Sequence, residues 1–211
     1  MLGKTTRKTL IAMVGTTVGV AAAAVAVTPT ASFAAAPAAS PAAAPAANRP
    51  SPAQLAEFER LVAKSLAASK SMATSKSMAT STTVSPDGIT AGDCDSVLTI
   101  SGNGLATAFP ALSDGNIDCA LRNGDSSDLA VGKLQRALNE CYGQNLATDN
   151  DFGPKTEQSV KNVQHFLGLN QTGVYDPVLI DAGFLYPIHF TSDNSFSGFC
   201  QDRNGNVISV G

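Results

Sequence analysis

The sequence predicts a mainly α-helical domain, in which three short helices form a small bundle with short β additions. The first observation is a series of three helix start and stop signals between residues 125 and 183. The second is that residues 97–100 and 196–210, on either side of this region, have the pattern of a strand and a hairpin. The third is the presence of four cysteines, an even number that indicates two disulfides in an exported chain.

The N-terminus has the pattern of a secretory signal peptide, which we place at residues 1–34. Lys4, Arg7 and Lys8 form a basic patch, an uncharged apolar run covers 9–27, and small residues follow. An uncleaved membrane anchor is the alternative, because 19 residues could just span a bilayer. The Ala, Gly and Thr content of the run disfavours stable insertion. We therefore expect a secreted protein, extracellular or associated with the cell wall, with no membrane span after cleavage.

Residues 35–86 are expected to form a tether that contains one helix at 51–69. Ala and Pro dominate 35–47, and a hexapeptide occurs twice in tandem at 69–80. Between these tracts, Ser51, Pro52 and Gln54 match a helix start. Apolar residues then recur on one helical face, at Leu55, Phe58, Leu61, Val62 and Leu66. The sequence does not identify the surface this face would cover, and a frayed linker helix is the alternative.

The remaining residues, 87–211, are expected to form an acidic domain held by two disulfides. They contain six Lys and Arg residues against 15 carboxylates, a formal charge of −9. Such a domain is repelled by phosphate backbones, which excludes nucleic acid as a partner and disfavours anionic wall polymers. A ligand that is neutral or carries amines remains compatible with this charge.

Each of the three helices of the predicted bundle is bounded by a recognisable signal. The expected starts and ends are Asp125 or Ser126 to Gly143, Pro154 to Gly168, and Asp176 to Gly183. In the first two helices, apolar residues recur every three or four positions, which gives each helix one face that must be buried. The bundle is expected to occupy residues 118–183.

Five short stretches in this region follow one another in a characteristic order. They are Val131-Gly132-Lys133-Leu134-Gln135, residues 149–156, Val160 with Val163-Gln164, Gly168-Leu169, and Thr172-Gly173-Val174-Tyr175. In order and spacing they resemble the peptidoglycan-binding domain found on many bacterial wall hydrolases. The run Asn139-Glu140-Cys141-Tyr142-Gly143 is further similar to a disulfide-bearing subgroup of that family in secreted actinobacterial proteins. The family pattern has Gly, Asp and Gly where this chain has Asn150, Thr172 and Asp176.

The resemblance implies that the domain binds peptidoglycan, and it indicates four candidate ligand-binding residues, Tyr142, Asn150, Gln164 and Tyr175. A tyrosine can pack against a sugar ring while its hydroxyl forms a hydrogen bond. The alternative for both tyrosines is a half-buried position at the rim of the fold. The alternative for Gln164 is that its amide satisfies backbone groups.

No catalytic residue, cofactor or metal site is predicted. The four cysteines are too far apart for a zinc motif, and His165 and His189 lie in separate elements, a helix surface and a predicted strand. Asp149 and Asp151 resemble the start of a calcium loop, but Pro154 stands where that loop needs Gly. We therefore expect a protein that is not an enzyme.

Four cysteines allow three disulfide pairings. If 97–100 and 196–210 form a small sheet, Cys94 and Cys200 would be joined across it, and Cys119 and Cys141 would be joined across the first helix. The sequence as a whole predicts a secreted, non-catalytic protein that binds peptidoglycan. The alternative is a secreted interaction protein, such as an extracellular enzyme inhibitor or protease partner, that reuses the fold.

Overall fold

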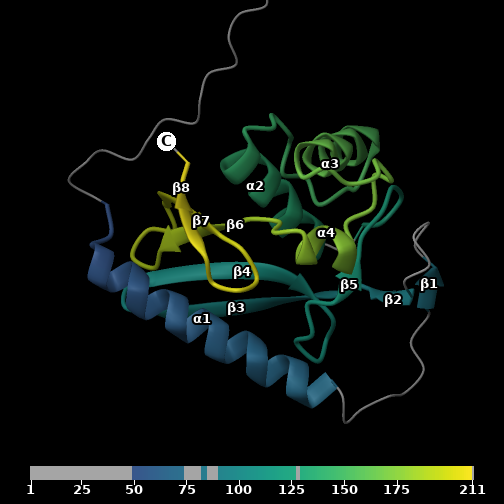
Figure 1. Ribbon diagram of the computed structural model, residues 1–211. Coiled ribbons are helices and arrows are strands. Elements are labelled where there is room, and N and C mark those ends of the chain that lie inside the picture. Colours follow the sequence, from purple (N-terminus) through teal and green to yellow (C-terminus); the bar gives the residue numbers. More distant parts are fainter. Residues whose placement is uncertain (1–48, 74–81, 85–89, 127–128, 211) are drawn as a thin grey trace, which may run out of the picture. The chain divides into compact units, whose positions relative to one another are not determined.

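A five-stranded antiparallel sheet lies at the centre of the structure. Its strands are β3 (Ser96–Gly102), β4 (Leu105–Ala111), β6 (Tyr186–Phe190), β7 (Phe196–Gln201) and β8 (Val207–Ser209), in the order β3-β4-β6-β7-β8. The computed structural model describes residues 49–73, 82–84, 90–126 and 129–210, all of which belong to the unit Ala38–Gly211 (Figure 1). The predicted signal peptide and the Ala/Pro tract lie outside the described residues.

The prediction of a mainly helical domain is therefore wrong. The helices at the expected positions do not form a separate three-helix bundle, because the core beneath them includes the sheet. Strand β4 was not predicted, because its Ala-rich sequence carries only a weak alternating pattern. Its neighbour β6 follows about 80 residues later in the chain, for example with Leu105 opposite Phe190, and local periodicity cannot reveal such a pairing.

A hairpin lies at each edge of the sheet, and of these two only the β7–β8 hairpin was predicted, within residues 196–210. The β3–β4 hairpin turns through Asn103 and Gly104, both of which have positive φ, as a two-residue turn between twisted strands requires. The β7–β8 hairpin turns through residues 202–206. Here the carboxylate of Asp202 accepts hydrogen bonds from the backbone N–H groups of Asn204 and Asn206. This interaction fixes the turn of the hairpin that the sequence predicted within residues 196–210.

Helix α1 (Pro52–Ala73) covers one face of the sheet. Its start is the predicted capping box, because the Ser51 N–H donates to the Gln54 side chain and the Gln54 N–H donates to the Ser51 hydroxyl. A Cβ atom on Gly102 would lie 2.5 Å from Leu61, so the strand β3 approaches the helix closely. Figure 1 shows α1 along one side of the sheet and the later helices on the other.

The sheet is the partner surface of α1 that the sequence could not identify. Phe58 and Val62 are fully buried and Leu66 is nearly so, in the same core cluster as the strands. Burial of such side chains contributes about 1.5–3 kcal/mol each. That contribution explains why a helix that would be marginal in water is stable in this protein.

The opposite face of the sheet carries α2 (Ala130–Tyr142), with α3 (Pro154–Phe166) and α4 (Pro177–Asp181) nearby. Their boundaries follow most of the predicted signals: Gly143 ends α2 in the left-handed conformation, and Asp176 caps α4 by accepting from the Leu179 N–H. The start of α2 differs. Asp125 does not cap the helix but accepts from the Arg122 N–H, and α2 begins later, after Leu129, which makes no side-chain cap.

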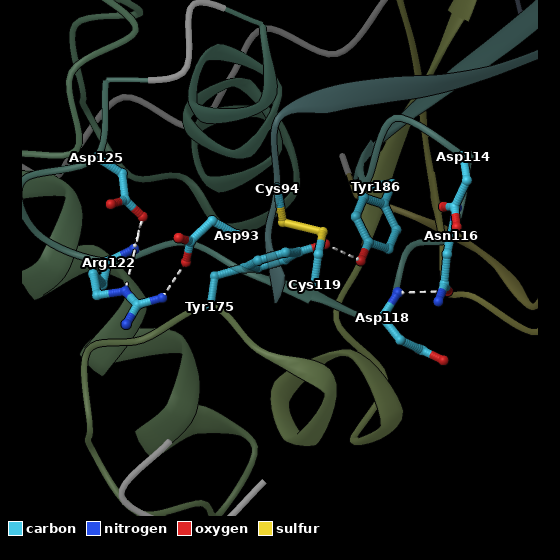
Figure 2. The surroundings of a disulfide bond; sticks show 10 residues. All are labelled: Asp93, Cys94, Asp114, Asn116, Asp118, Cys119, Arg122, Asp125, Tyr175 and Tyr186. Carbon is cyan, nitrogen blue, oxygen red and sulfur yellow. Dashed lines mark hydrogen bonds and ion pairs between the residues drawn. A yellow bond between two sulfur atoms is a disulfide. The ribbon is translucent and has the colours of Figure 1, made fainter. Parts of the chain in front are cut away.

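A second, three-stranded sheet has the order β1-β2-β5, from β1 (Thr82–Val84), β2 (Thr90–Asp93) and β5 (Cys119–Ala120). Strands β2 and β5 are parallel. The first disulfide, Cys94–Cys119, lies directly at their junction (Figure 2). Arg122 lies in the same region between Asp93 and Asp125, and pairs with both carboxylates.

The second disulfide joins Cys141 at the end of α2 to Cys200 in β7. Two disulfides are thus confirmed, but the predicted pairing of Cys94 with Cys200 and of Cys119 with Cys141 is wrong. The reason is that Cys94 follows a strand of the smaller sheet, whereas Cys200 belongs to the larger one. The sequence could not separate the two sheets.

Candidate functional site

One of the four candidate ligand-binding residues, Tyr175, is a core residue. Its side chain has no exposed surface, and its hydroxyl lies 2.7 Å from the hydroxyl of the equally buried Tyr186. Figure 2 shows the two rings meeting beside the Cys94–Cys119 disulfide. Burial raises the pKa of both hydroxyls, so both remain protonated at neutral pH. Tyr175 therefore has no surface to offer a ligand.

Gln164 is also buried, and its amide holds the turn after α3. The side-chain N–H₂ donates to the Thr172 hydroxyl and to the Val174 carbonyl, and the side-chain oxygen accepts from the Gly173 N–H. Gln135 on α2 holds the loop before α3 in the same way, because its side-chain N–H₂ donates to the Asp149 carboxylate and to the Asp151 carbonyl. These contacts are the backbone role that was the alternative for Gln164.

Asn150 lies in the loop that Gln135 holds. Its φ of 63° is left-handed, and its N–H donates to the side-chain oxygen of Gln135. A Cβ atom on Gly132 would lie 2.1 Å from the Asn150 side-chain oxygen, so this amide packs directly on the first turn of α2. Asn150 thus occupies a structural position on the loop, packed on a helix, and it is not among the residues that line the apolar surface described next.

Tyr142 is the one candidate residue that lines a groove. Its hydroxyl accepts a hydrogen bond from the Leu185 N–H, and burial raises its pKa. Its ring packs against Phe184 and meets the ring of Phe166 edge-on, with centroids 6.5 Å apart. Because the hydroxyl is engaged, the ring is the part of Tyr142 that faces the groove.

We call this feature the α2–α3 groove. It has a volume of about 410 Å³ and is lined by Cys141, Tyr142, Gln144, Asn162, Val163, Phe166, Leu185, Ile208 and Val210. Phe166 is 77% exposed and Ile208 is 45% exposed, which is unusual for large apolar side chains. None of these described lining residues carries a charge. The groove is therefore an apolar surface with a few amides, in an otherwise acidic protein.

Three local features give the groove its shape. Gly143 turns the chain out of α2 in the left-handed conformation, and the following Gln144 N–H bonds back to the Leu138 carbonyl. The Gln144 side chain then accepts from the Asn162 amide of α3 at 3.1 Å. The Cys141–Cys200 disulfide fixes the end of α2 against β7, and the adjacent β8 supplies Ile208.

Sequence reasoning missed Phe166, Gln144, Asn162 and Ile208. A signal for Phe166 was present: it lies off the buried stripe of α3, so an aromatic residue stood where a polar one is expected. Ile208 could not be found in this way, because its place beside α3 depends on the disulfide and on the pairing of β7 with β8.

Neither a membrane-spanning helix nor a metal-binding cluster occurs among the described residues. No helix among them is long and apolar enough to cross a membrane. The same residues contain no group of three or more His, Cys, Asp or Glu side chains that could hold a metal ion.

Comparison with known proteins gives a family match for one segment of the structure. Residues 127–182 match the family model described as "Putative peptidoglycan binding domain". This segment contains α2, α3 and α4, and the match confirms the predicted resemblance for it. No curated protein matches the chain.

Among solved structures, the chain is similar to a peptidoglycan-binding protein from Clostridioides difficile, solved in complex with glutamine hydroxamate. The identity is 23% and the TM-score is 0.31, and the match covers 50% of this chain and 65% of that one. The match thus spans less than two thirds of that protein. A likeness at this level shows neither a common fold nor a common ligand.

Proposed function

We propose that this protein is secreted and binds peptidoglycan without cleaving it, and that the α2–α3 groove is the binding surface. The observation that carries the proposal is that the segment matching the family model also supplies most of the groove, including its exposed Phe166. The run 139–143, which ends α2, supports placement in the disulfide-bearing group of secreted proteins.

The chemistry of the groove suits a sugar chain. The faces of sugar rings are apolar and pack on aromatic side chains, and Phe166 and Tyr142 provide such surfaces. Hydroxyl and acetamido groups need donors and acceptors at the rim. The amides of Gln144 and Asn162 already bond each other and the neighbouring Tyr142 and Gln158, but each keeps a second N–H and a second oxygen lone pair for a ligand. A concave apolar surface with a small number of polar groups is the usual form of a ligand site.

The charge distribution supports the same ligand class. The chain from residue 87 onward has a formal charge of −9, whereas the described groove residues are uncharged. A neutral glycan avoids the repulsion that an anionic wall polymer would meet. The basic, apolar and small-residue pattern of residues 1–34 supports export, which would bring the protein to the wall.

The test is co-sedimentation of the mature chain with purified, insoluble cell wall. We expect binding by the wild type and at least a tenfold loss for Phe166→Ala, because this ring makes the largest exposed apolar surface of the groove. Leu129→Ala is the matched control, since Leu129 is 62% exposed but lies outside the groove. Equal binding by wild type and Phe166→Ala would reject the groove, and failure of the wild type to sediment would reject wall binding.

The same incubation tests the non-catalytic part of the proposal. We expect no soluble muropeptides in the supernatant by mass spectrometry, and their time-dependent release would show a hydrolase.

A secreted interaction protein remains the second candidate, because exposed Phe166 and Ile208 would also suit a protein partner. It predicts that purified wall fails to bind while a secreted protein co-purifies with wild type but not with Phe166→Ala.

A further inference from the structure

A second pocket lies on the same side of the sheet as α2, between that helix and strands β3, β4 and β6. Its volume is about 80 Å³, and its wall includes Lys133, Arg136, Thr99, Ala106, Ala108 and His189. Figure 1 shows α2 on this side of the sheet, opposite α1. We call this feature the basic pocket. It shares no lining residue with the α2–α3 groove.

The pocket is locally positive in an acidic protein. Arg136 donates to Glu140 at 2.9 Å and to the Asn194 carbonyl, so its charge is partly balanced. Lys133 forms no ion pair with any carboxylate in the described part of the chain, although the chain is rich in carboxylates. With two cations and Glu140 as the neighbouring carboxylate, the pocket retains at least one positive charge.

The shape of the pocket limits what it can hold. Its volume of about 80 Å³ is small beside the roughly 300–1,000 Å³ of a drug-sized ligand pocket, so the pocket suits a small polar group. Ala106 and Ala108 leave the floor open because they have short side chains, and the exposed Thr99 adds a hydroxyl at the wall. A carboxylate is a small anionic group of this kind, and Lys133 and Arg136 both line the pocket.

We propose that the basic pocket binds a carboxylate, held by the Lys133 ammonium and the adjacent Arg136 guanidinium. Cations of this kind form charge-assisted hydrogen bonds with carboxylates, which are stronger than neutral ones. Peptidoglycan consists of glycan strands with short peptide stems that end in carboxylates. If the proposed function holds, the carboxylate is that of a stem peptide, while the groove holds the sugar chain. A free small carboxylate is the other source of the same chemistry.

The direct test uses a soluble probe, N-acetyl-D-alanyl-D-alanine, titrated into the mature chain and followed by NMR. We expect shifts at Lys133, Arg136 and Thr99, and about tenfold weaker binding for Lys133→Gln, which loses one charge-assisted bond. Lys133→Arg should restore binding. Lys64→Gln removes an equal charge from the exposed side of α1 and should have no effect. A second probe carries an amide in place of the C-terminal carboxylate. If it causes the same NMR shifts as the first probe, the proposal is overturned.

Cell wall whose stem carboxylates have been converted to amides separates this inference from the proposed function. Lys133→Gln should weaken binding to intact wall but not to amidated wall, whereas Phe166→Ala should weaken binding to both. If the wild type binds neither wall but binds the soluble probe, the carboxylate site stands and wall binding fails. If Lys133→Gln and the wild type bind both walls and the probe equally, the carboxylate site is wrong.

Discussion

The Nε2 atom of His189 lies 2.7 Å from a carboxylate oxygen of Glu140, and this contact joins β6 to α2. The other oxygen of Glu140 accepts from Arg136. Burial raises the pKa of Glu140, but the hydrogen bonds and charges of His189 and Arg136 outweigh it, so the pKa lies below its ordinary value of 4.5. The ionised form of Glu140 is therefore the one that stabilises the fold.

A lowered pKa in the folded state makes this stabilisation depend on pH. It is fully present above pH 4.5, the unfolded value, and it is lost as the pH falls through the lower folded pKa. We expect Glu140→Gln to lower the free energy of unfolding by about 1–2 kcal/mol at pH 7. Urea denaturation at pH 7 and below pH 4 measures the difference, which should shrink in acid. The exposed Glu57→Gln should show neither effect, and a Glu140→Gln penalty that is constant with pH would contradict the assignment.

The two disulfides should differ in what they support. Cys141–Cys200 closes a span of 59 residues, so its removal by double substitution with Ala should cost about 4 kcal/mol. Cys94–Cys119 closes 25 residues, for which we expect about 3.5 kcal/mol. Of the two removals, only that of Cys141–Cys200 should also weaken binding through the α2–α3 groove, because Cys141 lines the groove. Chemical denaturation and wall co-sedimentation of both variants check this, after non-reducing peptide mapping of the wild type has established the pairing.

Gly132 and Asn150 should be energetically coupled. Ala is favoured over Gly within a helix by about 0.8–1 kcal/mol, yet a Cβ atom at Gly132 would meet the Asn150 side-chain oxygen. We expect Gly132→Ala to destabilise the wild type by about 1 kcal/mol but to stabilise the Asn150→Gly variant by a similar amount. A double-mutant cycle measured by thermal or urea unfolding gives the coupling energy, which would be near zero if the two residues do not touch.

Helix α1 should unfold together with the sheet. Phe58 is fully buried against it, so Phe58→Ala should cost about 3–5 kcal/mol of global stability. The neighbouring Glu57 is exposed, and Glu57→Ala should change stability by no more than about 0.5 kcal/mol. Hydrogen exchange checks cooperativity: exchange of the α1 amides at a much faster rate than those of β4 would show that the helix is a separate linker element.

The sequence predicted the elements whose boundaries depend on local chemistry. Gly143, Pro154 and Asp176 mark helix ends by conformational preference or capping, and Ser51 with Gln54 forms a capping box within four residues. These signals need no knowledge of the rest of the fold.

What could not be predicted depends on contacts between distant residues. The alternation in β4 is hidden by alanines, and the disulfide pairing follows from which sheet each cysteine joins. The candidate ligand-binding residues were chosen wrongly for a different reason. A family pattern emphasises residues that hold turns in place, such as Gln164 and Tyr175, whereas the exposed Phe166 could be recognised only by its position off the buried stripe.

The hydrogen bond between Tyr175 and Tyr186 has a consequence for how such a protein can be recombined. Tyr175 belongs to the segment that matches the family model, but Tyr186, Leu121 and Cys200, all outside it, complete its core and its disulfide. Transplanting residues 127–182 alone into another protein would expose buried aromatic rings and leave Cys141 unpaired. A unit that keeps this core whole begins before α1 and extends to β8, because both elements contribute side chains to it.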